Sequence, residues 1–180
     1  CAAARCVKAQ PSADVKYGII PAPREIKARG KELLIYPDDS IVISYDSEGM
    51  RESAIQLQEI LEDEFDLDVT IIKNKPHRKA KAIIMSSEGC DSEEGYRLEV
   101  STSGIVLNGS RAGLFYAAQS LVQMIKAASR DSENLIVPGV SINDSPRFRY
   151  RGIMQDVGYH IYPVDFIKRQ IDYLAKYKMN

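Results

Sequence analysis

The segment that follows Gly113 and ends near Ala128 has the pattern that most limits how this chain can fold. Its apolar residues recur at three- and four-residue steps, which is the spacing of one face of an α-helix. The main stripe and the residues beside it are Leu114, Ala117, Leu121 and Met124, with Ala118, Val122 and Ile125. A face this broad has to be buried against other structure. We therefore expect this helix to pack against a sheet and against a second helix.

A second amphipathic helix is predicted between Glu48 and Phe65, where apolar residues again recur at helical spacing opposite a face of Glu and Gln. Short β-branched or aromatic runs surround the two helices and predict strands at residues 33–36, 41–45, 69–72, 82–86, 96–100 and 105–107. The turn residues 37–39 predict that the first two runs form a hairpin or a pair of neighbouring strands. The short link at residues 101–104 predicts a hairpin between the last two runs.

A different unit begins after the turn at residues 143–146. Residues 150–157 predict a strand, and residues 164–177 predict a helix. One strand followed by one helix indicates the first β/α unit of a repeating α/β domain. The 180 residues suffice for one full domain but fall short of the roughly 250 that a complete (β/α)₈ barrel needs.

Charge and composition limit the partners that this chain can have. The 24 Lys and Arg residues nearly balance the 25 Asp and Glu residues, for a net charge of -1, so no global field attracts nucleic acid or an anionic membrane. The basic link at residues 73–81 follows an acidic stretch and is interpreted as a solvated loop rather than an anion site. No apolar run approaches the roughly 18 residues of a membrane span, and the Cys and His spacing indicates no metal site.

Cys1 opens the chain, with no Met or signal sequence before it. A mature N-terminal Cys is what lipoprotein processing leaves, and residues 1–17, which carry no apolar period, would serve as a tether. The alternative is an arbitrary boundary of the sequence at this residue. Cys6 and Cys90 either pair in a disulfide or stay as free thiols. Lipidation of Cys1 would give a bacterial lipoprotein; otherwise we expect a secreted, periplasmic or cell-surface protein.

Five short motifs follow one another along nearly the whole chain from residue 17. They lie at residues 19–23 (IIPAP), 93–98 (EEGYRL), 113–124 (GLFYAAQSLVQM), 144–156 (DSPRFRYRGIMQD) and 178–180 (KMN). Each motif is weak alone, but their order is specific. Together they resemble glycoside hydrolase family 20, the β-N-acetylhexosaminidases. The fourth motif is similar to the start of the family's catalytic barrel, and the fifth to the segment that leads into barrel strand two.

The resemblance implies a fold in two parts. Residues 18–147 correspond to an N-terminal accessory domain, an α+β domain of the broad α/β class, in which a β-sheet has two helices packed on one face. Residues 148–180, called the C-terminal segment below, correspond to the first strand and helix of a truncated (β/α)₈ TIM barrel. The family's catalytic Asp-Glu pair follows a later barrel strand. The resemblance therefore implies that this chain has no catalytic residue and is inactive alone.

The family removes terminal N-acetylhexosamine from glycans with retention, and the substrate's own acetamido group is the nucleophile. The resemblance thus implies a glycosidase with a glycan substrate and no cofactor for the full-length protein. One alternative is a non-catalytic module that binds carbohydrate or supports the barrel. Another is a different glycosidase family with a similar accessory domain, such as the O-GlcNAcases or α-glucuronidases, although Asp156 favours family 20.

Three residues after the predicted strand are candidates for substrate contact. The family usually reads D-x-x-R-h there, with the Arg forking onto sugar hydroxyls. Here Asp156, Tyr159 and His160 occupy these positions, so a Tyr replaces the Arg. A Tyr can stack on a sugar or offer one hydroxyl, which puts standard specificity in question, or it can simply pack in the loop. Asp156 either binds sugar or orients a neighbouring Arg, and His160 either binds sugar or packs. Arg149 and Arg151 alternate with aromatic residues and are predicted to make domain contacts.

Overall fold

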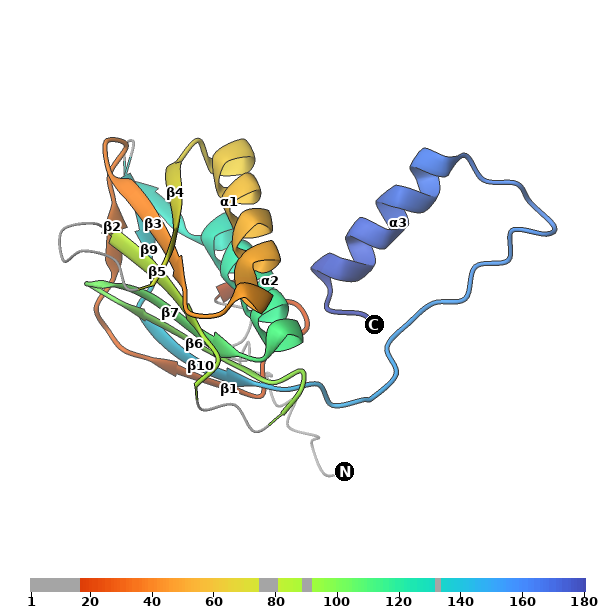
Figure 1. The fold of residues 1–180 in the computed structure, drawn as a ribbon, viewed down its shortest axis with the longest axis horizontal. Helices are drawn as coiled ribbons and strands as arrows, with labels where there is room; N and C mark the ends of the chain where they lie inside the picture. The colour runs from red at the N-terminus through yellow and green to blue at the C-terminus, as the bar shows by residue number, and fades with distance from the viewer. Residues whose placement is uncertain (1–16, 75–80, 89–91, 132–133) are drawn as a thin grey trace, which may run out of the picture.

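The computed structural model describes residues 17–74, 81–88, 92–131 and 134–180. Its main layer is a mixed seven-stranded sheet in the order β1-β10-β6-β7-β5-β3-β4 (Figure 1). The strands are β1 (Glu25–Ala28), β3 (Ser40–Tyr45), β4 (Asp68–Lys73), β5 (Lys81–Ser86), β6 (Tyr96–Ser101), β7 (Gly104–Gly109) and β10 (Val140–Asp144). A three-stranded sheet, in the order β2-β9-β8, is formed by β2 (Leu33–Ile35), β8 (Ser129–Asp131) and β9 (Asn134–Val137).

Two helices cover one face of the large sheet. The helix α1 (Arg51–Phe65), which follows a 3-10 turn η2 (Glu48–Met50), packs on β3 and β4, and α2 (Arg111–Ala127) packs on β6, β7 and α1. A third helix, α3 (Val164–Lys176), lies on the far side of α1 and α2 from the sheet (Figure 1). The predicted α+β arrangement, with two helices on one face of a sheet, is confirmed.

The core lies between the sheet and the two helices, where the sequence pattern placed the apolar stripes. Leu57 and Leu61 of α1 and Leu114 and Leu121 of α2 are fully buried. Each such side chain contributes about 1.5–3 kcal/mol by leaving water. The start of α2 is set by Ser110, whose Oγ accepts a hydrogen bond from the backbone N–H of Gly113 at 3.2 Å, the usual N-cap contact.

The predicted pairing of the first two strands is wrong. β2 runs antiparallel to β9 in the small sheet, whereas β3 lies between β4 and β5 and runs parallel to both. The turn between them does form, because the Tyr36 N–H donates to Asp39 Oδ2 at 2.7 Å. A strand followed by a long helix favours a parallel crossover to the next strand, and β3-α1-β4 is such a unit. That crossover places β3 in the interior of the large sheet and leaves β2 to pair elsewhere.

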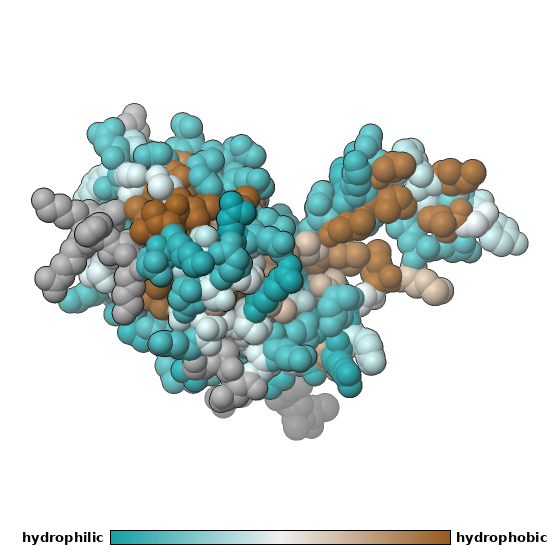
Figure 2. Space-filling view, viewed as in Figure 1, coloured by the Kyte–Doolittle hydropathy of each residue, from teal (hydrophilic) through white to brown (hydrophobic). Residues whose placement is uncertain are grey.

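The predicted strand at residues 150–157 is also not formed, whereas the helix predicted directly after it is present as α3. A barrel strand is held by hydrogen bonds to the strands on either side, and the described residues provide no neighbour for this one. Apolar side chains in residues 150–157 are therefore exposed to solvent, and Met154 is 97% exposed. Figure 2 shows apolar surface gathered on the part of the molecule that α3 occupies, and Ile161, Val164 and Ile171 are among its exposed residues.

Several predictions concern residues outside those described. Cys1 and Cys6, residues 75–80 of the basic link, and Cys90 lie there. The lipidation, disulfide and loop interpretations therefore stay predictions. Within the described ranges, no helix is long and apolar enough to cross a membrane.

Candidate functional site

The three predicted substrate contacts lie in the irregular stretch that precedes α3. Tyr159 is 92% exposed, and the Asp156 Oδ1 accepts a hydrogen bond from the backbone N–H of Gly158 at 2.7 Å. The His160 ring lies beside the Tyr162 ring, with centroids 6.5 Å apart. Asp156, Tyr159 and His160 do not line the cavity described next, and their role in substrate binding stays a prediction.

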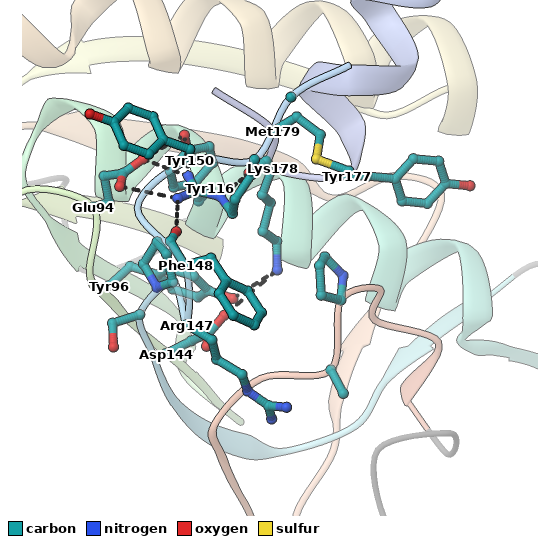
Figure 3. A pocket seen from close by; sticks show the side chains of 16 residues that line it. Glu94, Tyr96, Tyr116, Asp144, Arg147, Phe148, Tyr150, Tyr177, Lys178 and Met179 are labelled. Carbon is teal, nitrogen blue, oxygen red and sulfur yellow. Dashed lines mark hydrogen bonds and ion pairs between the residues drawn. The ribbon is translucent and has the colours of Figure 1, made fainter. Parts of the chain in front are cut away.

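A cavity of about 500 Å³ lies instead where the C-terminal segment meets the accessory domain (Figure 3). It is formed by the segment that leaves β10, by the end of the chain after α3, and by side chains of β6 and α2. Two groups of hydrogen-bonded side chains occupy its walls, one around Arg151 and one around Lys178. Both groups join residues that are far apart in the sequence.

Arg151 forms a bidentate ion pair with Glu94, which precedes β6. Its Nη2 lies 2.5 Å from Glu94 Oε1 and its Nη1 lies 3.2 Å from Oε2. The Arg151 side chain is 13% exposed and that of Glu94 25%. The Tyr116 hydroxyl of α2 accepts from Arg151 Nη2 at 3.1 Å and donates to Glu94 Oε1 at 3.0 Å. The hydrogen bond to Arg151 lowers the pKa of the Glu94 carboxyl, so this carboxylate stays ionised.

The same Arg joins the two ends of the C-terminal segment. Its Nη1 donates to the carbonyl of Phe148 at 2.8 Å, and its Nε donates to the carbonyl of Lys178 at 2.9 Å. Asn180 completes the closure, because its backbone N–H donates to the Arg151 carbonyl at 2.8 Å while its Oδ1 accepts from the Arg151 N–H at 2.9 Å. Its side-chain amide also donates to the carbonyl of Arg149 at 2.8 Å. Hydrogen bonds thus join the residues that precede α3 to the residues that follow it.

Lys178 is the second cation of this interface, and only 6% of the residue is exposed. Its Nζ donates to the Tyr96 hydroxyl at 3.1 Å and lies 3.8 Å from Asp144 Oδ2, and Figure 3 shows the side chain pointing toward Asp144. The Tyr96 hydroxyl also shares a hydrogen bond with Ser120 Oγ at 2.6 Å. Burial lowers the pKa of Lys178 to about 8, and the Asp144 charge opposes this shift in part.

Only part of this interface is predicted by the sequence. Arg151 was predicted to make domain contacts, and it does, whereas the Arg149 guanidinium lies over the ring of its neighbour Tyr150, 5.8 Å from the centroid. The motifs EEGYRL and KMN contain Glu94 and Lys178 and so marked both residues. Neither motif indicates which residues they contact. Among the described residues, no group of three or more His, Cys, Asp or Glu side chains could hold a metal ion.

Comparison with protein-family models assigns both parts of the chain. Residues 16–145 match the model described as glycosyl hydrolase family 20, domain 2, and residues 148–180 match glycosyl hydrolase family 20, catalytic domain. The chain belongs to glycosyl hydrolase family 20. The predicted family is thereby confirmed, and the chain is an N-terminal portion of a family 20 protein.

Named relatives and solved structures agree with this assignment. A Beta-hexosaminidase of Porphyromonas gingivalis is 34% identical over 176 residues, which are 94% of this chain but 22% of the relative. A Beta-hexosaminidase of Vibrio furnissii is 38% identical over 108 residues, which are 59% of this chain and 17% of the relative. The structure of a Streptomyces plicatus N-acetyl-beta-hexosaminidase superposes with a TM-score of 0.76 at 29% identity, covering 92% of this chain and 33% of the other. The chain thus spans about a fifth of the length of its curated relatives.

Proposed function

We propose that the full-length protein is a β-N-acetylhexosaminidase that removes terminal N-acetylhexosamine from glycans by substrate-assisted, retaining hydrolysis. The observation that carries the proposal is the direct continuation of a family 20 domain 2 match into a family 20 catalytic-domain match along one chain. Related structures support a glycan substrate, since a Vibrio harveyi family 20 exo-β-N-acetylglucosaminidase is known in complex with N-acetylglucosamine; it superposes with a TM-score of 0.74 at 29% identity and covers 92% of this chain and 25% of that one.

The roles proposed for the parts of this chain follow the same family matches. Residues 1–17 are a tether that ends at Tyr17, whose side chain is buried in the core, residues 18–147 are the accessory domain and residues 148–180 begin the catalytic barrel. The exposed apolar side chains of the C-terminal segment, such as Met154 and Ile171, suit a surface that further barrel strands and helices would cover. In a complete barrel, Asp156, Tyr159 and His160 would follow the first strand, at the end where the sites of this fold lie.

A location outside the cytoplasm fits a glycosidase of this kind, and we extend the proposal to a secreted, periplasmic or cell-surface protein. Lipidation of Cys1 is one way in which such a protein would be anchored. Metabolic labelling with a palmitate analogue in the native host would label the wild type but not a Cys1→Ser variant. Equal labelling of the two would exclude this anchor.

The activity is tested by expressing the full coding sequence and assaying chromogenic N-acetylglucosaminide and N-acetylgalactosaminide. We expect turnover by the full-length protein and none by the 180-residue chain. A full-length protein that hydrolyses neither substrate, or that lacks the Asp-Glu pair after a later barrel strand, would refute the proposal.

Tyr159 is tested in the same assay. The variant Tyr159→Arg restores the family's bidentate donor, and we expect it to raise kcat/KM on N-acetylglucosaminide about tenfold or more if Tyr159 faces the sugar. The matched variant Tyr159→Phe keeps the ring and removes only the hydroxyl. Unchanged kinetics in both variants would show that Tyr159 packs in the loop without touching substrate.

A further inference from the structure

The interface between the accessory domain and the C-terminal segment has an uneven distribution of charge. The accessory domain contributes the two carboxylates, Glu94 and Asp144, and the C-terminal segment contributes the two cations, Arg151 and Lys178. Each cation sits at one end of the C-terminal segment, on either side of α3. The ion pairs therefore hold the C-terminal segment at its two ends, while α3 adds a contact of its own, because the Lys176 carbonyl accepts a hydrogen bond from Gln123 Nε2 of α2 at 2.8 Å.

We propose that Glu94 and Tyr116 form a docking surface of the accessory domain for the C-terminal segment of the same chain, and that Arg151 is the positioning residue that locks both ends of the segment onto this surface. The inference concerns how the start of the barrel is held, and it does not depend on the hydrolytic activity proposed above.

The geometry of Arg151 carries the argument. Its guanidinium group meets one carboxylate in fork geometry, one tyrosine hydroxyl and two backbone carbonyls, those of Phe148 and Lys178. A Lys ammonium is a point charge with three donors and cannot reproduce this set of fixed directions. Because the two carbonyls belong to opposite ends of the C-terminal segment, one side chain sets the distance between those ends and fixes both relative to Glu94.

The backbone after α3 supports the same reading. Lys178 has a φ of 60°, in the left-handed region, and its N–H bonds to the Ala175 carbonyl while the Met179 N–H bonds to the Leu174 carbonyl. This is the helix-ending geometry in which Gly is usual. A long side chain here costs some strain, and it turns the chain so that the Lys178 carbonyl reaches Arg151 and the amine reaches Tyr96.

Hydrogen exchange in the 180-residue chain, resolved by residue at neutral pH, tests the proposal. The reporter is the Asn180 N–H, which is bonded to the Arg151 carbonyl. In the variants Arg151→Lys and Glu94→Gln we expect exchange at this amide to accelerate about tenfold or more, since each variant removes the charge-assisted fork. Amides of β7, in the centre of the accessory sheet, should keep their wild-type rates.

A matched control is available within the accessory domain. Arg29 forms an ion pair with Glu99 of β6, with Nη2 2.9 Å from Oε1, and the side chains are 49% and 41% exposed. The variant Arg29→Lys changes the same chemistry away from the interface and should leave Asn180 at its wild-type rate. The double variant of Arg151→Lys with Glu94→Gln should be no faster than the faster of the two single variants, because Glu94 acts on the segment through Arg151.

Three results would overturn the proposal. The first is an unchanged rate at Asn180 in both single variants. The second is an equal acceleration at Asn180 and in β7, which would show a general loss of stability rather than release of the segment. The third is full additivity in the double variant. All three can be observed whether or not the full-length protein hydrolyses glycans.

Discussion

Raising the pH from about 7 to about 9.5 perturbs one buried charge of the interface selectively, the ammonium group of Lys178. Its pKa is about 8 in the folded chain against an ordinary value of 10.5. Between these values the unfolded chain binds the proton and the folded chain does not, so the free energy of unfolding rises with pH. The stabilisation is complete above the ordinary pKa and is lost as the pH falls through about 8.

The magnitude follows from the size of the shift. A difference of about 2.5 pH units corresponds to about 3 kcal/mol in total, of which about 2 kcal/mol is gained between pH 7 and pH 9.5. Tyr96, which faces the amine, does not titrate in this range, because burial raises its pKa well above the ordinary value. Asp144 is the other charged group that faces the amine, with its Oδ2 3.8 Å from Lys178 Nζ.

Urea denaturation followed by far-UV circular dichroism measures this effect when the wild type is compared with Lys178→Met at each pH. Groups that titrate in both proteins cancel in the difference between their unfolding free energies. We expect that difference to move by about 2 kcal/mol in favour of the wild type as the pH rises from 7 to 9.5. A difference that stays flat, or that moves in favour of the variant, would refute the reasoning, since the second result requires Asp144 to outweigh burial. Lys176→Met, two residues away, is the control and should show no such dependence.

Two further substitutions test the packing around the same interface, and a third tests the end of α1. Gly113→Ala would place a Cβ 2.1 Å from the Gly95 carbonyl oxygen, and we expect it to lower the free energy of unfolding by about 2 kcal/mol in urea titrations. Tyr96→Phe removes the partner of Ser120 and Lys178 and should cost about 1–2 kcal/mol, whereas a neutral result would deny the hydrogen bonds a net role. Asp66→Gly relieves a residue with a φ of 57° at the end of α1, and should raise the thermal midpoint by an amount equivalent to about 0.5–1 kcal/mol, in contrast to the first two.

The helices could be predicted from the sequence because their apolar period persists over several turns. Leu57 and Leu121 stand in such stripes and are fully buried in the structure. The order of the strands could not be predicted in the same way. The turn between β2 and β3 fits a hairpin as well as it fits a change of sheet, and what decides between them is the crossover through α1, a long-range effect. The strand predicted at residues 150–157 requires neighbours that the described residues do not supply.

The interface was less predictable than the fold because its groups interact over long separations. Glu94 and Arg151 are 57 residues apart, and no local pattern pairs them. The lowered pKa of Lys178 is equally invisible in the sequence, since it arises from the burial of the amine and not from its neighbours along the chain. The motifs marked both regions as belonging to one family, and only the fold showed that they touch.

Arg151 and Lys178 hold the C-terminal segment in different ways, although both are cations that face a carboxylate. The Arg151 guanidinium donates to both oxygens of the Glu94 carboxylate and to the Phe148 carbonyl. The carboxylate therefore compensates its charge at every physiological pH. Lys178 is under-compensated, since Asp144 lies at 3.8 Å and the pKa falls despite it. Replacing such a buried cation by an apolar residue of similar length is often neutral or stabilising. Lys178 therefore fixes the position of the chain after α3 rather than adding stability. Its Nζ has to meet the Tyr96 hydroxyl, and this contact defines where α3 ends on the accessory domain.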